Sequence, residues 1–336
     1  RRLRWDLRRR LVFLGLFFFS GPALFFFGYV ESYSWLLVAM TGFVLGGQAY
    51  LEERGPLWAP SFFWSLGLFF HLTAIFSLPA LAYLGWTAWS RQDPESRAKK
   101  LTSLFLPPML AIALSLSLHL ALGFDHSWFQ NEYLSGTHTR GLLVSATGPE
   151  GLFSTYQGKM QLNLLLLVSP VSLVMLLLSA RFLKTRWRQP LVIFLGVQIL
   201  SVALASLLVQ RKLGDAQDWD LLAAHFVGLP LLATHCWFGQ DASRNRRSSA
   251  WPAVFALLVF LPWLALNAQE NGSRERFSSV AGGFPPFKQG YAFENLGRHH
   301  QKSGQLEAAL AMYEQGAAAC PSHARFQKLV GTTSLE

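Results

Sequence analysis

Residues 191–209 read LVIFLGVQILSVALASLLV, an apolar run without a single Lys, Arg, Asp or Glu. A run of about 20 such residues has the length that an α-helix needs to cross the hydrocarbon core of a bilayer, which is about 30 Å thick. Residues 101–122 form a second uncharged run. A surface helix of a soluble domain is apolar on one face only, so these runs predict helices that lie in a membrane.

The composition of the whole chain is also that of a membrane protein. Of 336 residues, 51% are hydrophobic and 14% are charged, whereas soluble domains carry about 25% charged residues. We therefore expect an all-α, polytopic transmembrane helix bundle over residues 1–267, followed by a small extramembrane helical hairpin. About nine spans are predicted, at residues 11–27, 33–50, 57–70, 72–89, 101–122, 161–180, 191–209, 221–238 and 251–267.

The stretch 57–89 is too long for one ordinary crossing, with His71 near its middle and Pro79 after it. Two helices that turn near His71 fit this length, and one strongly tilted span is the alternative. The basic residues favour the turn, because merging the two spans would move the loop from Arg91 to Lys100 to the other side of the membrane.

Basic residues divide unequally between the two predicted sides. If the N-terminus is cytoplasmic, the outer loops hold only four, Arg140, Lys159, Arg211 and Lys212. This bias is typical of membrane orientation and predicts a multi-pass protein of the bacterial inner membrane with a periplasmic C-terminal tail. The cytoplasmic side holds eighteen: Arg1, Arg2, Arg4, Arg8, Arg9, Arg10, Arg54, Arg91, Arg97, Lys99, Lys100, Arg181, Lys184, Arg186, Arg188, Arg244, Arg246 and Arg247.

The net charge of +10 does not indicate nucleic-acid binding, because the bases stand in short loops between apolar runs. The expected surroundings are membrane lipids. Cys236 and Cys320 lie in different segments, so no disulfide framework or metal spacing is predicted. His119, His126, His138 and His225 lie on or near the outer side but match no zinc-ligand pattern.

After the last predicted span the composition becomes polar. Residues 268–289, with Gly282-Gly283 and Pro285-Pro286, are predicted to be a linker. Residues 290–336 are predicted to be an incomplete repeat region, with an amphipathic period from Tyr291 to His323. They place Phe293, Leu296, Gly297, Gly304, Ala309, Tyr313 and Pro321 at fixed intervals.

This tail resembles a tetratricopeptide repeat, a helix–turn–helix of 34 residues. Gly297 and Ala309 are small where the helices are expected to touch, and Gly304 permits a left-handed turn. His300 and Gly316 depart from the usual Tyr and Ala, and Val330-Gly331 begins a second, incomplete repeat. The resemblance implies a protein or peptide partner bound through residues 290–336. A packing appendage of the membrane domain is the alternative.

Candidate chemistry is confined to polar residues beside apolar runs. Glu31 stands at the tip of a short outer loop, where a carboxylate can take a proton from a sugar hydroxyl or hold a divalent cation. A solvated loop acid is the alternative. His71 is an ionisable residue among apolar neighbours, which indicates a functional role, although a histidine that only packs between helices fits equally well.

A third candidate is the outer loop at residues 210–220. Arg211 and Lys212 can hold a phosphate, and Trp219 can stack on a sugar or anchor at the interface. Asp218 and Asp220 can divide acid and base roles or share a metal. No phosphate loop, dinucleotide fingerprint or zinc-protease motif occurs in the sequence.

The segments around residues 27–31, 71–79 and 214–221 resemble bacterial membrane proteins related to the C-class integral-membrane glycosyltransferases. The resemblance implies transfer from a polyprenyl-phosphate-linked sugar at the outer face, with Glu31, His71, Asp218 and Asp220 as catalytic residues. Arg211, Lys212 and Trp219 would bind substrate, and a divalent cation is the cofactor such acids can hold. The family's usual catalytic Asp lies in the first outer loop, where this chain has Glu31, unless an earlier loop precedes the sequence.

Two other classes of function remain open. A non-enzymatic membrane scaffold or complex subunit would recruit partners through the tetratricopeptide-like tail. A transporter would require charges within the spans, and the predicted spans 101–122, 161–180 and 191–209 contain none.

Overall fold

The structure, a computed structural model, describes residues 7–26, 33–90, 94–123, 127, 151–208, 222–239 and 251–335. Within them the fold is all-α, with fifteen α-helices, three 3-10 helices and no strand. The chain forms two compact units, residues 1–260 and 261–336, and α14 runs from the first into the second. The sequence placed this division at residue 267.

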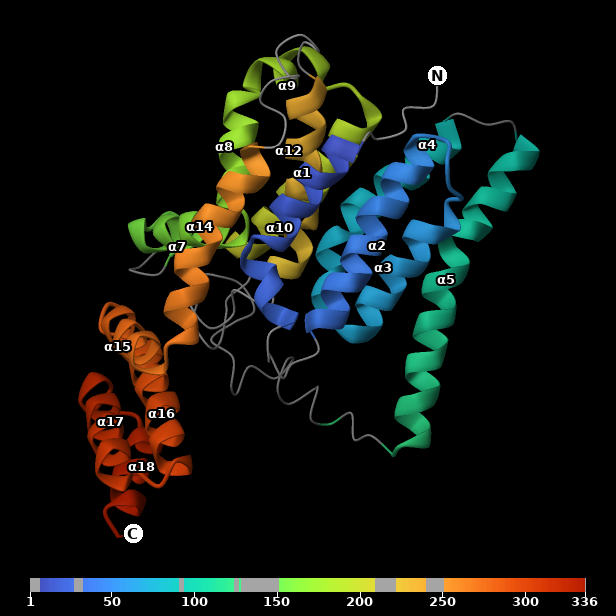
Figure 1. Ribbon diagram of the computed structural model, residues 1–336. Helices are drawn as coiled ribbons and strands as arrows, with labels where there is room; N and C mark the ends of the chain where they lie inside the picture. Colours follow the sequence, from blue (N-terminus) through green and yellow to red (C-terminus); the bar gives the residue numbers. More distant parts are fainter. Residues whose placement is uncertain are drawn as a thin grey trace. The chain divides into compact units, whose positions relative to one another are not determined.

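The first unit is a bundle of helices (Figure 1). In chain order it contains α1 (Leu7–Phe18), η1 (Gly21–Phe26), α2 (Tyr33–Leu51), α3 (Trp58–Phe70), η2 (Leu72–Ser77), α4 (Leu78–Ser90), α5 (Pro94–Ala121), α7 (Thr155–Val168), α8 (Pro170–Leu178), α9 (Ala180–Arg186), α10 (Pro190–Leu208), η4 (Ala224–Val227), α12 (Gly228–Gly239) and α14 (Trp251–Ala268).

Five of these stretches are long and apolar enough to cross a membrane, namely Tyr33–Leu51, Leu72–Ser90, Arg97–Ala121, Pro190–Leu208 and Trp251–Ala268. A bent pair of helices, α7 and α8, would make a sixth. The fold is therefore compatible with a multi-pass membrane protein, whereas nine spans are not confirmed. Helices α1, α3 and α12 have only 12, 13 and 12 residues, about 20 Å at about 1.5 Å per residue, which is shorter than the hydrocarbon core.

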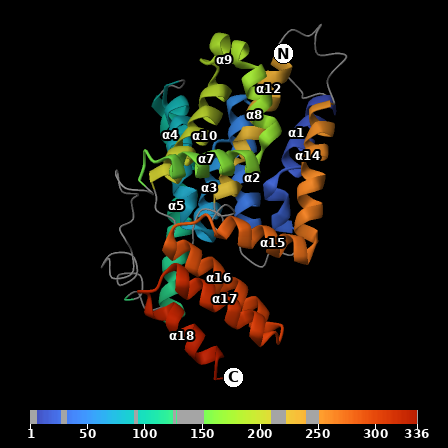
Figure 2. The same ribbon diagram turned by 90° about the vertical axis from the view of Figure 1, so that its left-hand side faces the viewer.

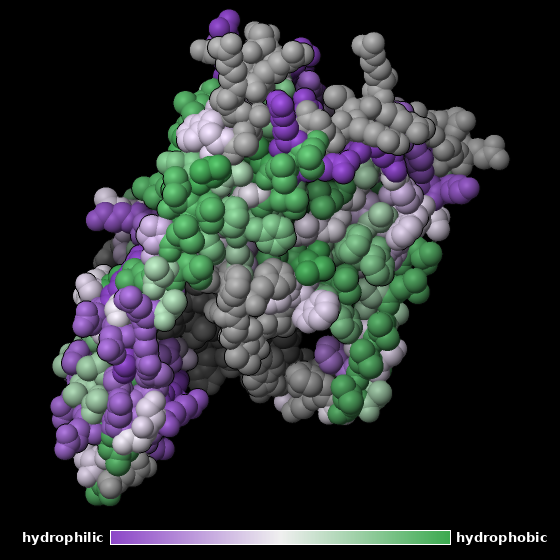
Figure 3. Space-filling view, viewed as in Figure 1, coloured by the Kyte–Doolittle hydropathy of each residue, from purple (hydrophilic) through white to green (hydrophobic). Residues whose placement is uncertain are grey.

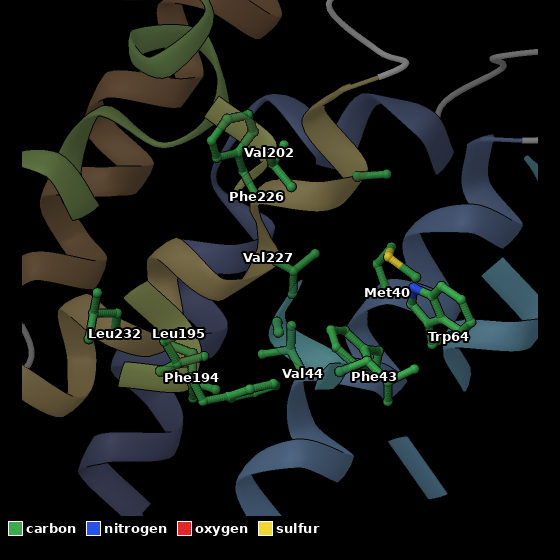
Figure 4. Packing of buried hydrophobic residues seen from close by; sticks show 14 of the residues in the cluster. Met40, Phe43, Val44, Trp64, Phe194, Leu195, Val202, Phe226, Val227 and Leu232 are labelled. Carbon is green, nitrogen blue, oxygen red and sulfur yellow. The ribbon is translucent and has the colours of Figure 1, made fainter. Parts of the chain in front are cut away.

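The core of the first unit lies where α2, α3, α4, α10 and η4 meet (Figure 4). Phe43 of α2 meets Phe194 of α10 edge to face, with ring centroids 5.6 Å apart. A Cβ atom on Gly47 would come within 2.4 Å of the Phe194 ring. Only glycine therefore allows α2 and α10 to approach this closely.

The exposed face of the first unit is apolar (Figure 3). Helix α5 is the least buried of the five long apolar helices. Only 6% of its apolar segment is buried, and the side chains of Met109, Leu110 and Leu120 are exposed. Exposed tryptophans stand near helix ends, as at Trp58 of α3 and Trp251 of α14. Lipid on the apolar faces and headgroups at the tryptophans would account for both observations.

Most described basic residues of this unit belong to the segments at one end of the bundle, where α9, the end of α4 and the start of α5 lie, whereas Lys159 is on α7 (Figures 1 and 2). Arg97 of α5 stacks on the ring of Trp89 at the end of α4, 5.1 Å from its centroid. Helix α3 starts four residues after Arg54 and runs to the opposite end, where it stops before His71.

The chain reverses at His71, as the sequence predicted. His71 is extended, with φ −158° and ψ 133°, between α3 and η2. The indole Nε1 of Trp64 donates to the carbonyl of Ala74 at 2.9 Å. Ten residues of continuous helix would separate these two positions by about 15 Å, so this hydrogen bond requires a fold-back.

The predicted span 161–180 differs from a straight helix. Helix α7 ends at Val168, and α8 begins at Pro170 with a bend of 96° between them. Proline has no N–H and disfavours helical backbone in the residue before it, and Ser169 accordingly lies outside the helical region. Figure 2 shows α7 crossing the bundle, where a hydrogen bond from Gln161 Nε2 to the Ser206 carbonyl, 3.0 Å long, ties it to α10.

The second unit contains α15 (Glu270–Ala281), α16 (Pro286–Lys302), α17 (Leu306–Ala319) and α18 (Ala324–Thr333). The segment 268–289, expected to be a linker, thus carries α15. Gly282, Gly283 and Pro285 follow this helix, and Phe277 and Ala281 pack against Ala292 of α16. Apolar contact with α16 explains why this polar segment is helical.

Helices α16 and α17 form the expected hairpin. A Cβ atom on Gly297 would lie 2.3 Å from Cε1 of Tyr313, and Gly304 has φ +73° in the turn. Gly290 makes a similar approach to the ring of Phe326 in α18. Membership of the tetratricopeptide family stays a prediction.

Candidate functional site

The strongest candidate site is a cluster of buried and half-buried polar side chains at the His71 reversal. It comprises His71 and Thr73 before and in η2, Ser77 at the end of η2, Gln198 of α10 and His225 of η4. Ser77, Gln198 and His225 are fully buried. Ala74, next to Thr73, and Val202, four residues after Gln198, belong to the apolar core, so each buried polar group depends on hydrogen-bond partners within the cluster.

Thr73 connects the two histidines. Its Oγ1 lies 2.9 Å from Nδ1 of His71 and 2.9 Å from Nε2 of His225. The backbone N–H of Thr73 also donates to His71 Nδ1, at 3.2 Å. His71 therefore caps the first turn of η2, and its ring is fixed at the reversal by two contacts from one residue.

Gln198 forms the second half of the cluster. Its amide Nε2 donates to Oγ of Ser77 at 2.8 Å and to the backbone carbonyl of His225 at 3.2 Å. The carbonyl can only accept, which fixes the orientation of the amide. Gln198 thus connects α10, η2 and η4 at one point in the core.

Two buried acceptors of the cluster lack a hydrogen-bond donor among the described residues, namely Nδ1 of His225 and Oε1 of Gln198. A buried polar atom without a partner is destabilising by about 1–3 kcal/mol, and both occur here on fully buried residues joined by a hydrogen bond. The cluster can therefore accept hydrogen bonds from a bound group.

Of the seven site residues that the sequence predicted, the structure describes His71. Glu31, Arg211, Lys212, Asp218, Trp219 and Asp220 lie outside the described residues. Their described neighbours are informative, however. The ring of Tyr33, two residues after Glu31, packs on the ring of His71 with centroids 5.7 Å apart. His225, five residues after Asp220, reaches His71 through Thr73.

Sequence reasoning placed His225 only among zinc-ligand candidates and did not select Gln198. Both are polar residues inside predicted spans, which is itself a sign of function. His126 and His138 lie outside the described residues, and His119 lies far along α5. In the part of the chain that the structure describes, no three His, Cys, Asp or Glu residues gather as metal ligands.

The fold and this cluster define an all-α protein with several membrane-compatible helices and a buried polar centre. No protein family, curated protein or solved structure to which the chain was compared matches it.

Proposed function

We propose that the protein is a membrane glycosyltransferase-like enzyme that acts at the outer face on a sugar carried by polyprenyl phosphate. The observation that carries this proposal is the convergence on His71. Tyr33 and His225, which follow the acid-bearing segments at Glu31 and at Asp218 and Asp220, both approach it. Three parts of the chain that are separated in sequence, at Tyr33, His71 and His225, thus come together at the reversal.

Residue chemistry then suggests a division of roles. Arg211 and Lys212 bind the lipid phosphate, because cationic side chains make charge-assisted hydrogen bonds to phosphate oxygens. Trp219 stacks on the sugar. A carboxylate of Glu31, Asp218 or Asp220 accepts the proton of the acceptor hydroxyl, and a divalent cation held by these acids would neutralise the leaving phosphate.

The test is a transfer assay in proteoliposomes that contain radiolabelled polyprenyl-phosphate hexoses. Label should leave the lipid phase with the wild-type protein and stay there when Asp218 and Asp220 are both changed to Asn. Glu307→Gln on α17 is the matched control, since it also removes a carboxylate but lies in the tail. No release from any hexose of the panel, with and without Mg²⁺ or Mn²⁺, would contradict the proposal.

Orientation is tested separately with an impermeant thiol reagent. In a background with Cys236 and Cys320 replaced, a cysteine at Ser135 should react from outside and one at Ser248 should not. The opposite pattern would reverse the proposed sidedness. It would also remove the outer face as the place of reaction.

A second candidate function, a scaffold that recruits a protein or peptide, is favoured by the tail. Residues 261–336 form a compact unit of their own, with the α16–α17 hairpin closed by Gly297 against Tyr313. Gly297→Trp and Gly304→Pro should open the hairpin and abolish capture of partners from detergent extracts, whereas Gly331→Ala, in open space on α18, should not. Unchanged capture by both hairpin variants would leave the tail as an appendage.

A further inference from the structure

The hydrogen bonds that join His225, Thr73 and His71 have a direction, which follows from their donors and acceptors. Nδ1 of His71 accepts the backbone N–H of Thr73, so this nitrogen carries a lone pair and the proton of a neutral His71 is on Nε2. The single hydroxyl proton of Thr73 then points to His71 Nδ1, 2.9 Å away.

The same reasoning fixes His225. Because the Thr73 hydroxyl has given its proton to the bond with His71, its oxygen must accept from His225 Nε2 at 2.9 Å. His225 is therefore protonated on Nε2 and carries its lone pair on Nδ1. That atom is the one that is buried without a donor among the described residues. All three bonds point the same way, from His225 towards His71.

The three side chains in this series of hydrogen bonds differ in burial. His225 is fully buried in η4, whereas Thr73 and His71 are half-buried at the reversal. The chain begins at an unpaired basic nitrogen in the core and ends at a histidine at one end of the bundle. Ser77, Gln198 and Met40 fix the core side, since Gln198 holds the backbone carbonyl of His225 and Ser77 contacts the sulfur of Met40.

We propose that His225, Thr73 and His71 form a proton relay that takes a proton from a hydroxyl group bound at His225 Nδ1 and delivers it to His71. As the hydroxyl proton moves to Nδ1, the Nε2 proton of His225 moves to Thr73 Oγ1. The original Thr73 proton moves to His71 Nδ1. His225 ends neutral in its other tautomer, Thr73 ends as a hydroxyl and His71 ends as the imidazolium, so protons and charge balance with the oxyanion left behind.

A relay of this kind places the positive charge on His71 and keeps His225 neutral, while the oxyanion stays at His225 Nδ1. An imidazolium on fully buried His225 would lack water, whereas His71 is half-buried beside Tyr33. A charged group within the hydrocarbon region is costly, so transfer along the two fixed hydrogen bonds of the Thr73 hydroxyl, which puts the imidazolium on half-buried His71, is more favourable than an imidazolium on His225. The inference goes beyond the proposed sugar transfer, because it applies to any hydroxyl donor, including water.

The relay is tested by hydrogen–deuterium exchange at His225 Nε2, followed by ¹⁵N NMR of histidine-labelled protein in lipid. Wild-type protein should show Nε2 protonated and Nδ1 bare in His225, assigned from the signal lost in His225→Asn. Thr73→Val keeps the shape and removes the hydroxyl, and should slow exchange about a hundredfold, the lower end of what a positioned proton-transfer group contributes. Thr73→Ser should restore exchange.

Two results would overturn the relay. One is a wild-type His225 with its proton on Nδ1, which needs no variant to observe. The other is equal exchange in Thr73→Val and wild type when each protein is measured the same number of degrees below its own melting temperature. The transfer assay distinguishes the source of the hydroxyl: if a substrate supplies it, Thr73→Val lowers sugar transfer, and if water supplies it, exchange alone changes. Slowed exchange without any sugar transfer would support the relay and contradict the proposed enzyme.

Discussion

Each compact unit buries a polar cluster, the His71 cluster in the first and the Glu294 cluster in the second, and the two clusters differ in charge. In the bundle, His71, Thr73 and His225 are joined by hydrogen bonds, without a described carboxylate or guanidinium among the cluster's side chains. In the tail, the carboxylate of Glu294, only 1% exposed, accepts from Arg298 and Arg325 at 2.8 Å each.

The exposed surfaces of the two units differ in the same way. Arg298 and Arg325 are about half exposed, and the surface of the tail is largely hydrophilic (Figure 3), so both cations keep part of their hydration. The hydrogen bond to Glu294 raises the pKa of Arg325 above its ordinary value. The bundle exposes apolar side chains instead, and there a charge without water is costly. Uncharged donors and acceptors are the alternative that an apolar environment allows.

The largest effect is expected in the tail. Glu294→Ala leaves two arginines without their shared carboxylate and should lower the free energy of unfolding of the tail by about 3 kcal/mol, the lower end for a broken buried pair because the partners are half exposed. Urea unfolding followed by limited proteolysis of the tail measures it. Glu307→Ala, on the exposed first turn of α17, should change little. Equal losses would remove the special role of Glu294.

A smaller effect on stability is expected in the bundle, where a leucine-to-alanine change at a buried position is compared with the same change at an exposed one. Leu195→Ala, on a fully buried residue of α10, should destabilise the bundle by about 2 kcal/mol through lost packing. Leu110→Ala on α5, where the side chain is 60% exposed, should change stability by less than about 0.5 kcal/mol. Unfolding in mixed micelles compares them. A large loss at Leu110 would mean that another protein surface covers α5.

Glycine against an aromatic ring provides a third comparison. Gly297→Ala places a methyl group into the Tyr313 ring and should destabilise the tail by about 1–2 kcal/mol. Gly331→Ala, also helical but with open space around it, should instead stabilise by about 0.5 kcal/mol. Thermal melting of the two variants should therefore shift in opposite directions, and a common direction would contradict the packing argument.

The smallest effect is expected at Thr73. Thr73→Val removes the partner of both His71 Nδ1 and His225 Nε2 and should destabilise the bundle by about 1 kcal/mol. Thr102→Val on α5, whose exposed hydroxyl bonds only the carbonyl of Ala98 four residues earlier, is the control and should be neutral. Calorimetry in lipid can resolve the difference, and equal melting temperatures would show that the chain of hydrogen bonds adds no stability.

The sequence was sufficient to predict helices and turns wherever a strong local pattern, such as a long uncharged run, determines the structure. Uncharged runs predicted α5 and α10 to within a few residues, except that α5 starts earlier, at Pro94. Run length and basic residues together predicted the reversal at His71. The bend at Ser169 was missed although Pro170 signals it, because hydropathy alone does not distinguish a straight apolar helix from two helices at 96°.

The remaining errors concern contacts between distant residues. Helix α15 forms in a polar segment because it packs on α16, and no local signal shows that partner. The link from His71 to His225 spans 154 positions of the sequence and depends on η2 meeting η4. His71 was selected from its own surroundings, whereas Gln198 and His225 gain their roles only through tertiary structure. Glu31, Asp218 and Asp220 stay predictions.

The shortness of α3 has a consequence for the lipid around it. A helix of 13 residues is about 20 Å long, so a bilayer of ordinary thickness would have to compress by several ångströms beside it. Elastic strain of this kind is least where acyl chains are short. We therefore expect the protein to partition into thin bilayers and its melting temperature to fall as the lipid acyl chains lengthen. Trp58, exposed at the start of α3, would lie at the level of the lipid headgroups beside this helix.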